Sequence, residues 1–300
     1  MFNKILTKIN YNIKKFLNYN KALVGQGTLL LKRKKYENIK KLQETELKIF
    51  SQNGEDGIID FILNKIQLNI KVNFVEIGVG DYEESNTRFL TETRLIRGLI
   101  VDSSSEINFV KSRNFYWKNN LYVSKSIVSS ENINQILNKY NFSNNYDLLS
   151  LDIDGIDYWV LEKITLEKVK VVILEYNPMF GSNLKLTIPN INNFKRLDYH
   201  KSYYGMSLRA AIQIMENKGF SFIGNNSICC NAFFINKKLK HLFNGIILDK
   251  IEDSTQLNFF ENKSNSYQKN TKDFIIREMQ DLDLLDLEKR NIIKIKNLDL

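Results

Sequence analysis

Over residues 45–236, short apolar runs alternate with longer stretches in which apolar residues recur at helical spacing. The runs, in chain order, are VNFVEIGV, GLIVD, LYVSKSIV, DLLSLDI and VVILEY. Such runs are typical of strands that are buried on both faces of a sheet. The helical spacing predicts helices over residues 46–65, 86–96, 105–113, 131–139 and 158–167. Regular alternation of helix and strand predicts a parallel, doubly wound α/β sheet.

The pattern changes after Glu175, where a polar loop over residues 177–203 carries both prolines of the chain. A loop of this length inside a compact domain is usually a lid or a substrate-binding segment. A helical stretch ending at Gly219 follows, and the runs FSFIG and NAFFINKK then predict an antiparallel hairpin at one sheet edge. A late amphipathic helix is predicted by the spacing of Ile275, Met279, Leu282 and Leu285. We therefore expect three parts, over residues 1–41, 42–240 and 241–300.

Basic charge gathers in the first part, where residues 1–41 hold eleven Lys and Arg and the single acid Glu37. Because the whole chain has a formal charge of +9, this local +10 leaves about −1 for the rest. Apolar residues from Phe2 to Leu17 recur at helical spacing with lysines opposite them. Such a helix over residues 1–20 could lie on an anionic membrane surface, pack on its own domain or contact a second subunit. The near-neutral body argues against nucleic acid as a partner.

Composition describes a globular chain of 300 residues, 43% of them hydrophobic. The two cysteines, Cys229 and Cys230, are adjacent, which suits neither a long-loop disulfide nor a zinc site. No stretch approaches the roughly 18 apolar residues that a membrane-spanning helix needs. We expect a reducing, cytoplasmic location, with the basic segment as a peripheral membrane contact if it binds lipid.

The first two predicted strands end in acidic residues. The first gives EIGVGD, in which Gly78 and Gly80 let the backbone approach a ligand and Glu76 supplies a carboxylate. The third glycine of a dinucleotide fingerprint is missing, and Glu83 stands in its place. Asp102 at the end of the second strand is placed to accept the hydroxyls of a ribose, or to cap a helix. Acidic residues at the ends of two strands, without the glycines that bind phosphate, favour a cofactor that combines an adenosine with a positive centre. S-adenosylmethionine is such a cofactor.

The fourth strand runs into SLDIDGIDYW, which places Asp152, Asp154 and Asp157 within a short stretch. Together with Asn177 these side chains could hold Mg²⁺, which prefers oxygen ligands. Alternatively, one aspartate contacts the cofactor, one caps the next helix and one is exposed. If the reaction needs a general base, the candidates are Asp154, Glu175 and His200.

Two other functional classes fit parts of this pattern. A metal-dependent glycosyltransferase would use Asp152 and Asp154 to hold the metal of a nucleotide diphosphate, but no Lys or Arg cluster follows these strands to meet phosphates. A non-catalytic adaptor on a methyltransferase-like fold would have lost its cofactor contacts, and the contacts are present in the sequence.

Four motifs occur in a fixed order, SQNGED, FVEIGVGD, SNTRFL and GLIVD. In this order the sequence resembles the FkbM-type S-adenosylmethionine-dependent methyltransferases, over roughly residues 50–176. The resemblance implies a class I, Rossmann-like fold with a mostly parallel seven-stranded sheet, and methyl transfer to a hydroxyl of a sugar or polyketide. We expect the acceptor to be a sugar in a surface glycan or glycolipid precursor. Cofactor contacts implied by the resemblance, with Asp152 added from the fourth strand, are Gln52, Glu55, Glu76, Gly78, Gly80, Asn86, Asp102 and Asp152.

Overall fold

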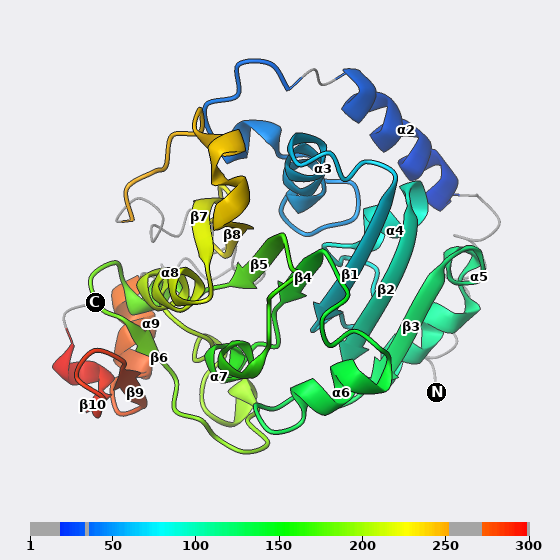
Figure 1. The fold of residues 1–300 in the computed structure, drawn as a ribbon. Coiled ribbons are helices and arrows are strands. Elements are labelled where there is room, and N and C mark those ends of the chain that lie inside the picture. Colours follow the sequence, from blue (N-terminus) through cyan, green and yellow to red (C-terminus); the bar gives the residue numbers. More distant parts are fainter. Residues whose placement is uncertain (1–18, 34–35, 252–271, 299–300) are drawn as a thin grey trace, which may run out of the picture.

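A seven-stranded sheet forms the centre of the protein (Figure 1), as seen in a computed structural model that describes residues 19–33, 36–251 and 272–298. Its strand order is β3-β2-β1-β4-β5-β8-β7, with β1 to β5 parallel and β8 antiparallel to both of its neighbours. The strands are β1 (Lys71–Ile77), β2 (Leu95–Asp102), β3 (Asn120–Lys125), β4 (Leu148–Leu151), β5 (Val171–Glu175), β7 (Phe220–Asn225) and β8 (Asn231–Asn236). The predicted Rossmann-like sheet with an antiparallel hairpin at one edge is confirmed.

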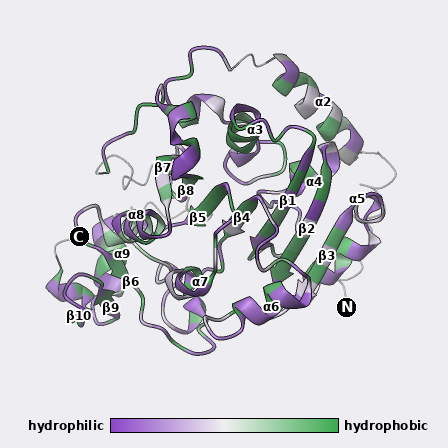
Figure 2. Ribbon diagram, in the orientation of Figure 1, coloured by the Kyte–Doolittle hydropathy of each residue, from purple (hydrophilic) through white to green (hydrophobic). Residues whose placement is uncertain are grey.

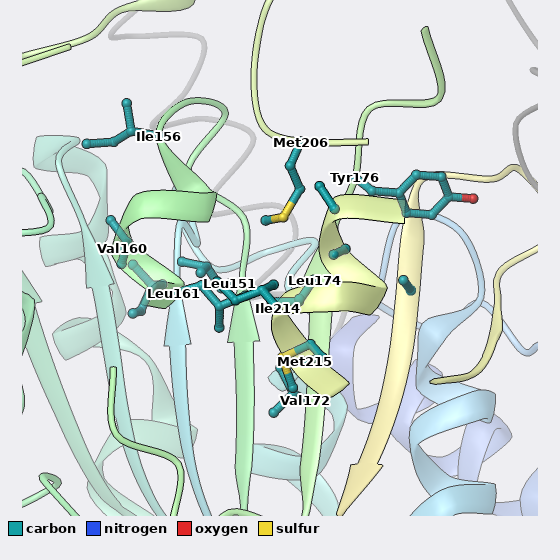
Figure 3. Close-up of a cluster of buried hydrophobic side chains, with 14 of the residues drawn as sticks. Leu151, Ile156, Val160, Leu161, Val172, Leu174, Tyr176, Met206, Ile214 and Met215 are labelled. Carbon is teal, nitrogen blue, oxygen red and sulfur yellow. The ribbon is translucent and has the colours of Figure 1, made fainter. Parts of the chain in front are cut away.

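Successive residues of the central strands point to opposite faces of the sheet, and both faces are covered. In β1, Val75 and Ile77 join one buried cluster while Phe74 joins the other. Three helices pack on the first face: α6 (Ile133–Lys139), α7 (Asp157–Lys163) and α8 (Leu208–Asn217). Figure 3 shows side chains of α7 and α8 in this cluster. Elements on the second face are α3 (Glu55–Lys65), α4 (Arg88–Thr93), α5 (Asn114–Lys118) and the 3-10 helix η2 (Ser105–Ser112). Because helices cover both faces of the sheet, the central strands are apolar on both sides, which explains their uninterrupted apolar runs (Figure 2).

The helix predicted over residues 46–65 begins only at Glu55. Gly54 takes a left-handed conformation with φ +91°, and the preceding residues form a loop. Asp56 holds this loop, because one of its carboxylate oxygens accepts backbone N–H groups of Ile49, Phe50 and Ser51 at 2.6–2.9 Å. The SQNGED segment is thereby folded back towards the carboxyl edge of the sheet.

A second sheet joins the long loop to the end of the chain, and the sequence analysis missed it. Strand β6 (Leu186–Thr187) pairs with β9 (Asp283–Asp286), which pairs with β10 (Asn291–Lys294). The predicted late helix is present only in part: α9 (Lys272–Glu278) contains Ile275 but ends before Met279, and Leu285 lies in β9. The second sheet and α9 lie near α8 at one end of the molecule (Figure 1). The tail is therefore a helix followed by a hairpin, and the boundaries of the three expected parts stay predictions.

Short 3-10 helices complete the fold: η1 (Leu42–Thr45), η3 (Pro178–Phe180), η4 (Arg196–Asp198), η5 (Lys237–Phe243) and η7 (Ile295–Asn297). Helix α2 (Tyr19–Arg33) contacts α4. The helix predicted from Phe2 to Leu17 lies outside the described residues. Within the described ranges, none of the helices has the length and apolar character needed to cross a membrane.

Candidate active site

Five residues form one row across the carboxyl edge of the parallel strands. Gly78 follows β1, Asp102 ends β2, Asp152 follows β4, Glu175 ends β5 and Asn231 begins β8. The strand registers place these positions level with one another. In an open α/β sheet this edge is where ligands bind. Four of the five were predicted as site residues, and Asn231 was not.

A pocket of about 900 Å³ opens above this row. Its size suits a cofactor together with part of a second substrate. All eight residues predicted to contact the cofactor line it, and so do the two catalytic candidates Asp154 and Glu175. Their proposed roles rest on this placement, which brings residues from four strands and the SQNGED loop to one cavity.

The pocket wall is strongly acidic. Nine of its lining residues are carboxylic acids: Glu55, Glu76, Asp81, Glu83, Glu84, Asp102, Asp152, Asp154 and Glu175. Among the described residues that line it, none is Lys, Arg or His. A wall of this charge attracts a cationic ligand and repels a diphosphate.

The turn after β1 needs glycine for two different reasons. At Gly78, φ is +86° and a Cβ atom would lie 1.4 Å from the carbonyl oxygen of Asp152. At Gly80, φ is +54° and a Cβ atom would meet no atom within 4 Å. The Gly80 amide donates to one oxygen of Asp102 at 2.7 Å, and the other oxygen accepts from the Ser104 amide at 2.6 Å. The turn is therefore packed tightly on β4 and open towards the pocket.

Two of the predicted cofactor residues hold neighbouring segments in place. Glu76 is 3% exposed, and its carboxylate accepts the backbone amides of Asn86 and Thr87 at 2.8 and 2.9 Å. Burial raises the pKa of Glu76 to about 7. The Glu55 carboxylate accepts the side-chain amides of Asn226 and Asn231, both at 2.8 Å. Each residue thus shapes the pocket wall through its own hydrogen bonds.

The two remaining cofactor candidates differ in exposure. Asn86 donates from its side chain to the Ser150 hydroxyl at 3.0 Å, which fixes it against β4. Gln52 is an exposed residue of the SQNGED loop at the pocket wall.

The centre of the row holds a carboxyl pair. Asp152 and Glu175 lie next to each other, and Asp154 brings a third carboxyl group, so that one oxygen of each residue lies within 4.8 Å of the others. Burial, and then the charge of Asp154, raise the pKa of Asp152 to about 7. Burial and the Asp152 charge hold the pKa of Glu175 well above its usual range. The raised pKa values of both groups favour a single proton held between Asp152 and Glu175.

The long loop reaches this centre through an ion pair. Arg196 of η4 binds the Asp154 carboxylate, and its guanidinium lies 5.5 Å from the centre of the Tyr204 ring. Asp154 stands in a left-handed conformation with φ +54°. Burial raises its pKa, and the Arg196 charge opposes that shift. Asn193 and Phe194 of the same loop line the pocket.

The four-residue metal site predicted from the sequence is not assembled. Asp157 accepts the amides of Ile153 and Gly155 at 2.8 and 3.0 Å and begins α7. Asn177 caps η3 by accepting from the Met179 amide at 3.0 Å, and its NH₂ group donates to two backbone carbonyls. Neither side chain lines the pocket, so only Asp152 and Asp154 of the predicted ligands meet, with Glu175 as the third carboxylate.

His200 also lies apart from the pocket. It is not among the lining residues, and its Nε2 atom is 3.1 Å from a carboxylate oxygen of Glu278 on α9. Its role as a general base is therefore not retained, because the ring contacts the tail of the chain rather than the carboxyl pair.

Comparison with known proteins gives a family. The model of the methyltransferase FkbM domain matches residues 60–222, which is more than half of the chain. The comparison with curated proteins gives no match. Among solved structures, the N-terminal domain of EvdMO1 with S-adenosylhomocysteine bound aligns at 11% identity, over 63% of this chain and 82% of that chain, with a TM-score of 0.40.

Two further solved structures are similar at the same level. A 1,6-didemethyltoxoflavin N1-methyltransferase from Burkholderia thailandensis aligns at 10% identity over 62% of this chain and 79% of that chain, with a TM-score of 0.38. A putative O-methyltransferase from Nostoc punctiforme aligns at 14% identity over 61% and 55% of the two chains, with a TM-score of 0.35. The identification rests on the family model, which argues against the glycosyltransferase and adaptor alternatives. The chain belongs to the FkbM methyltransferase family and is an S-adenosylmethionine-dependent methyltransferase.

Proposed function

We propose that the protein is an O-methyltransferase that methylates a hydroxyl group of a sugar in a surface glycan or glycolipid precursor. The observation that carries this proposal is the Asp152–Glu175 carboxyl pair at the floor of the pocket. An alcohol loses its proton when it is methylated, so the site needs a group that accepts a proton near neutral pH. Asp152, predicted as a cofactor contact, is the member of the pair that can do so.

The residues around the pocket fit S-adenosylmethionine. Asp102 would bind the ribose hydroxyls through lone pairs that its two backbone contacts leave over. Gly80, where a Cβ atom would meet nothing within 4 Å, would allow close approach of the methionine half. The acidic wall complements the positive sulfur. When bound, this cofactor supplies an electrophilic methyl group on a sulfonium.

Glu175 and Asp152 have different roles in the reaction. Glu175 donates to one oxygen of Asp152 and so holds that carboxylate in a fixed orientation. The other lone pairs of Asp152 accept the proton of the acceptor hydroxyl as its oxygen forms the bond to carbon. Arg196 is paired with Asp154, which leaves Asp152 as the proton acceptor.

One aromatic ring at the pocket supports a sugar as the acceptor. Phe194 lines the cavity and stacks on Tyr199, with ring centres 5.3 Å apart and planes inclined by 13°. Flat aromatic faces of this kind pack well on the apolar face of a sugar ring. Phe180 and Tyr203 of the same loop are buried to 0% and 1% exposure, so they belong to the core.

A panel of acceptors tests the proposal directly. Purified protein and S-adenosylmethionine with a labelled methyl group are incubated with methyl glycosides, with amines and with carboxylic acids of similar size. We expect label in the glycosides as methyl ethers. Transfer to amines or carboxylic acids, with none to the glycosides, would refute sugar O-methylation and leave the family assignment intact.

Replacing Asp102 with alanine should weaken binding of S-adenosylhomocysteine by about tenfold or more, since two charge-assisted hydrogen bonds to the ribose would be lost. Calorimetric titration measures the affinity, and circular dichroism checks the fold. Asp81→Ala is the matched control, because Asp81 lines the same pocket but bonds only to the Glu83 amide in its own turn. Equal affinities of the Asp102 variant and the wild type would remove the ribose assignment.

A divalent cation held by Asp152, Asp154 and Glu175 is the second arrangement that the pocket supports, because their oxygens lie within 4.8 Å of one another. The Asp154 carboxylate is already paired with the Arg196 guanidinium, which engages one of the three candidate ligands and favours the metal-free form. We therefore expect methyl transfer to survive dialysis against EDTA at more than half of its rate. A rate that disappears with EDTA and returns with Mg²⁺ or Mn²⁺ would establish the metal instead.

Residues 1–18, which make up nearly all of the predicted N-terminal helix, lie outside the described part of the chain. Their contact with an anionic membrane surface or with a second subunit therefore stays a prediction, as does a cytoplasmic location at the inner face of the membrane.

A further inference from the structure

Two buried oxygen atoms of the pocket have no hydrogen-bond partner among the described residues. One is Oε2 of Glu175, and the other is Oδ1 of Asn231. Both residues line the pocket, and Asn231 is only 8% exposed. Buried acceptors are normally paired, so each of these atoms marks a place where a donor is expected.

The orientation of Asn231 is fixed by its neighbours. Its NH₂ group donates to Glu55 at 2.8 Å, and that carboxylate oxygen also accepts from Asn226 at 2.8 Å. A flipped amide would set its carbonyl oxygen against the Glu55 carboxylate, which is repulsive. Oδ1 is therefore the atom that is left for a partner.

The two acceptors lie side by side. Glu175 and Asn231 are directly opposite each other in the antiparallel pair of β5 and β8. Residues in this relation point to the same face, with their Cβ atoms about 5 Å apart. One small ligand can therefore reach both side chains.

The position of the pair separates it from the cofactor. Asp102 and Gly78 lie on β2 and β1, whereas Asn231 lies on β8, four strands along from β2. At about 4.8 Å per strand, Asn231 is roughly 19 Å from the Asp102 end of the row. Asp152, the proposed proton acceptor, lies between them. The pair thus belongs to the half of the pocket that faces the acceptor.

We propose that Glu175 and Asn231 form an acceptor subsite that recognises a second polar hydrogen next to the hydroxyl being methylated. The ligand is a saccharide with two neighbouring donors, either a vicinal diol or an amino group beside a hydroxyl. One hydroxyl meets Asp152 and loses its proton there, while an adjacent hydroxyl donates its one hydrogen to Asn231 or Glu175, or an adjacent amino group donates to both. This inference rests on the proposed sugar O-methylation and adds Asn231 as a specificity-determining residue.

Matched acceptors test the subsite. Methyl transfer is measured with a methyl glycoside that carries a vicinal diol, with its monodeoxy analogues and with its monoamino analogues. A buried site built around a hydrogen bond rejects a ligand that lacks the donor, so the wild type should prefer the diol to the deoxy analogue by about 30-fold or more in kcat/KM. Equal use of the amino analogue would identify an amino sugar, and its rejection would identify a diol.

Two alanine variants separate recognition from structure. Asn231→Ala and Asn226→Ala each remove one donor to the same Glu55 oxygen, but only the first removes the pocket acceptor. The preference for the diol should fall to less than threefold in Asn231→Ala and stay near the wild-type value in Asn226→Ala. Because this preference is a ratio within one preparation, partial unfolding does not change it.

The outcomes are distinct for the two proposals. Transfer to glycosides without a preference for the second donor, or a preference that survives in Asn231→Ala, overturns the subsite alone. A wild type that binds S-adenosylhomocysteine but methylates none of the glycosides overturns the proposed function and the subsite with it.

Discussion

Gly78→Ala is expected to lower the free energy of unfolding by about 3 kcal/mol and to abolish cofactor binding. The added Cβ atom would lie 1.4 Å from the carbonyl oxygen of Asp152 and 2.5 Å from its carbonyl carbon, so the ends of β1 and β4 must separate. Overpacking of this kind costs about 1–3 kcal/mol, and the left-handed backbone adds roughly 1–2 kcal/mol for a residue with a Cβ. Urea unfolding measures the first effect and calorimetry with S-adenosylhomocysteine measures the second.

Gly80→Ala is the control for this variant, because it also stands at positive φ in the same turn. Its Cβ atom would point into open space, so only the backbone cost of about 1 kcal/mol applies. We expect a stable fold and weaker binding from a methyl group placed in the pocket. If Gly78→Ala bound S-adenosylhomocysteine as tightly as Gly80→Ala, the close approach of β1 and β4 would not be what shapes the site.

The contrast between the two glycines shows what the sequence can and cannot predict. Apolar runs identify buried strands, and the parallel arrangement then brings the ends of those strands to one edge. For that reason Glu76, Asp102, Asp152 and Glu175 could be assigned to one pocket before the fold was known. The carbonyl of Asp152 against Gly78 depends on how closely two strands approach, and no residue pattern encodes that distance.

Hydrogen bonding within loops is the second reason that the site could not be fully predicted from the sequence. Asp157 and Asn177 have the chemistry of metal ligands, yet their side-chain oxygens accept hydrogen bonds from backbone amides within four residues in the sequence. Asp and Asn side chains commonly bind nearby backbone groups in this way. Asn231 was overlooked because it begins an edge hairpin, where a polar residue is unremarkable from the sequence. Only its position opposite Glu175 and its unpaired oxygen distinguish it.

Asp152→Asn should reduce methyl transfer by about 10²–10⁴-fold, since the amide cannot accept the proton of the acceptor hydroxyl. S-adenosylhomocysteine should bind within about threefold of wild type, because the amide has nearly the same shape as the carboxylate. Glu175→Gln is the matched variant: glutamine still donates to Asp152, so we expect it to keep at least about a tenth of the wild-type rate.

The pH dependence of the rate gives an independent check on Asp152. Burial and the Asp154 charge raise its pKa to about 7, and the group must be a carboxylate to accept a proton. The rate should therefore rise as the pH increases through about 7 and level off above it, since protonation removes the base below that value. In Asp152→Asn the residual rate should lack this rise. A variant that keeps more than a tenth of the wild-type rate and the same pH profile would show that another group accepts the proton, and Asp154 would be the next residue to replace.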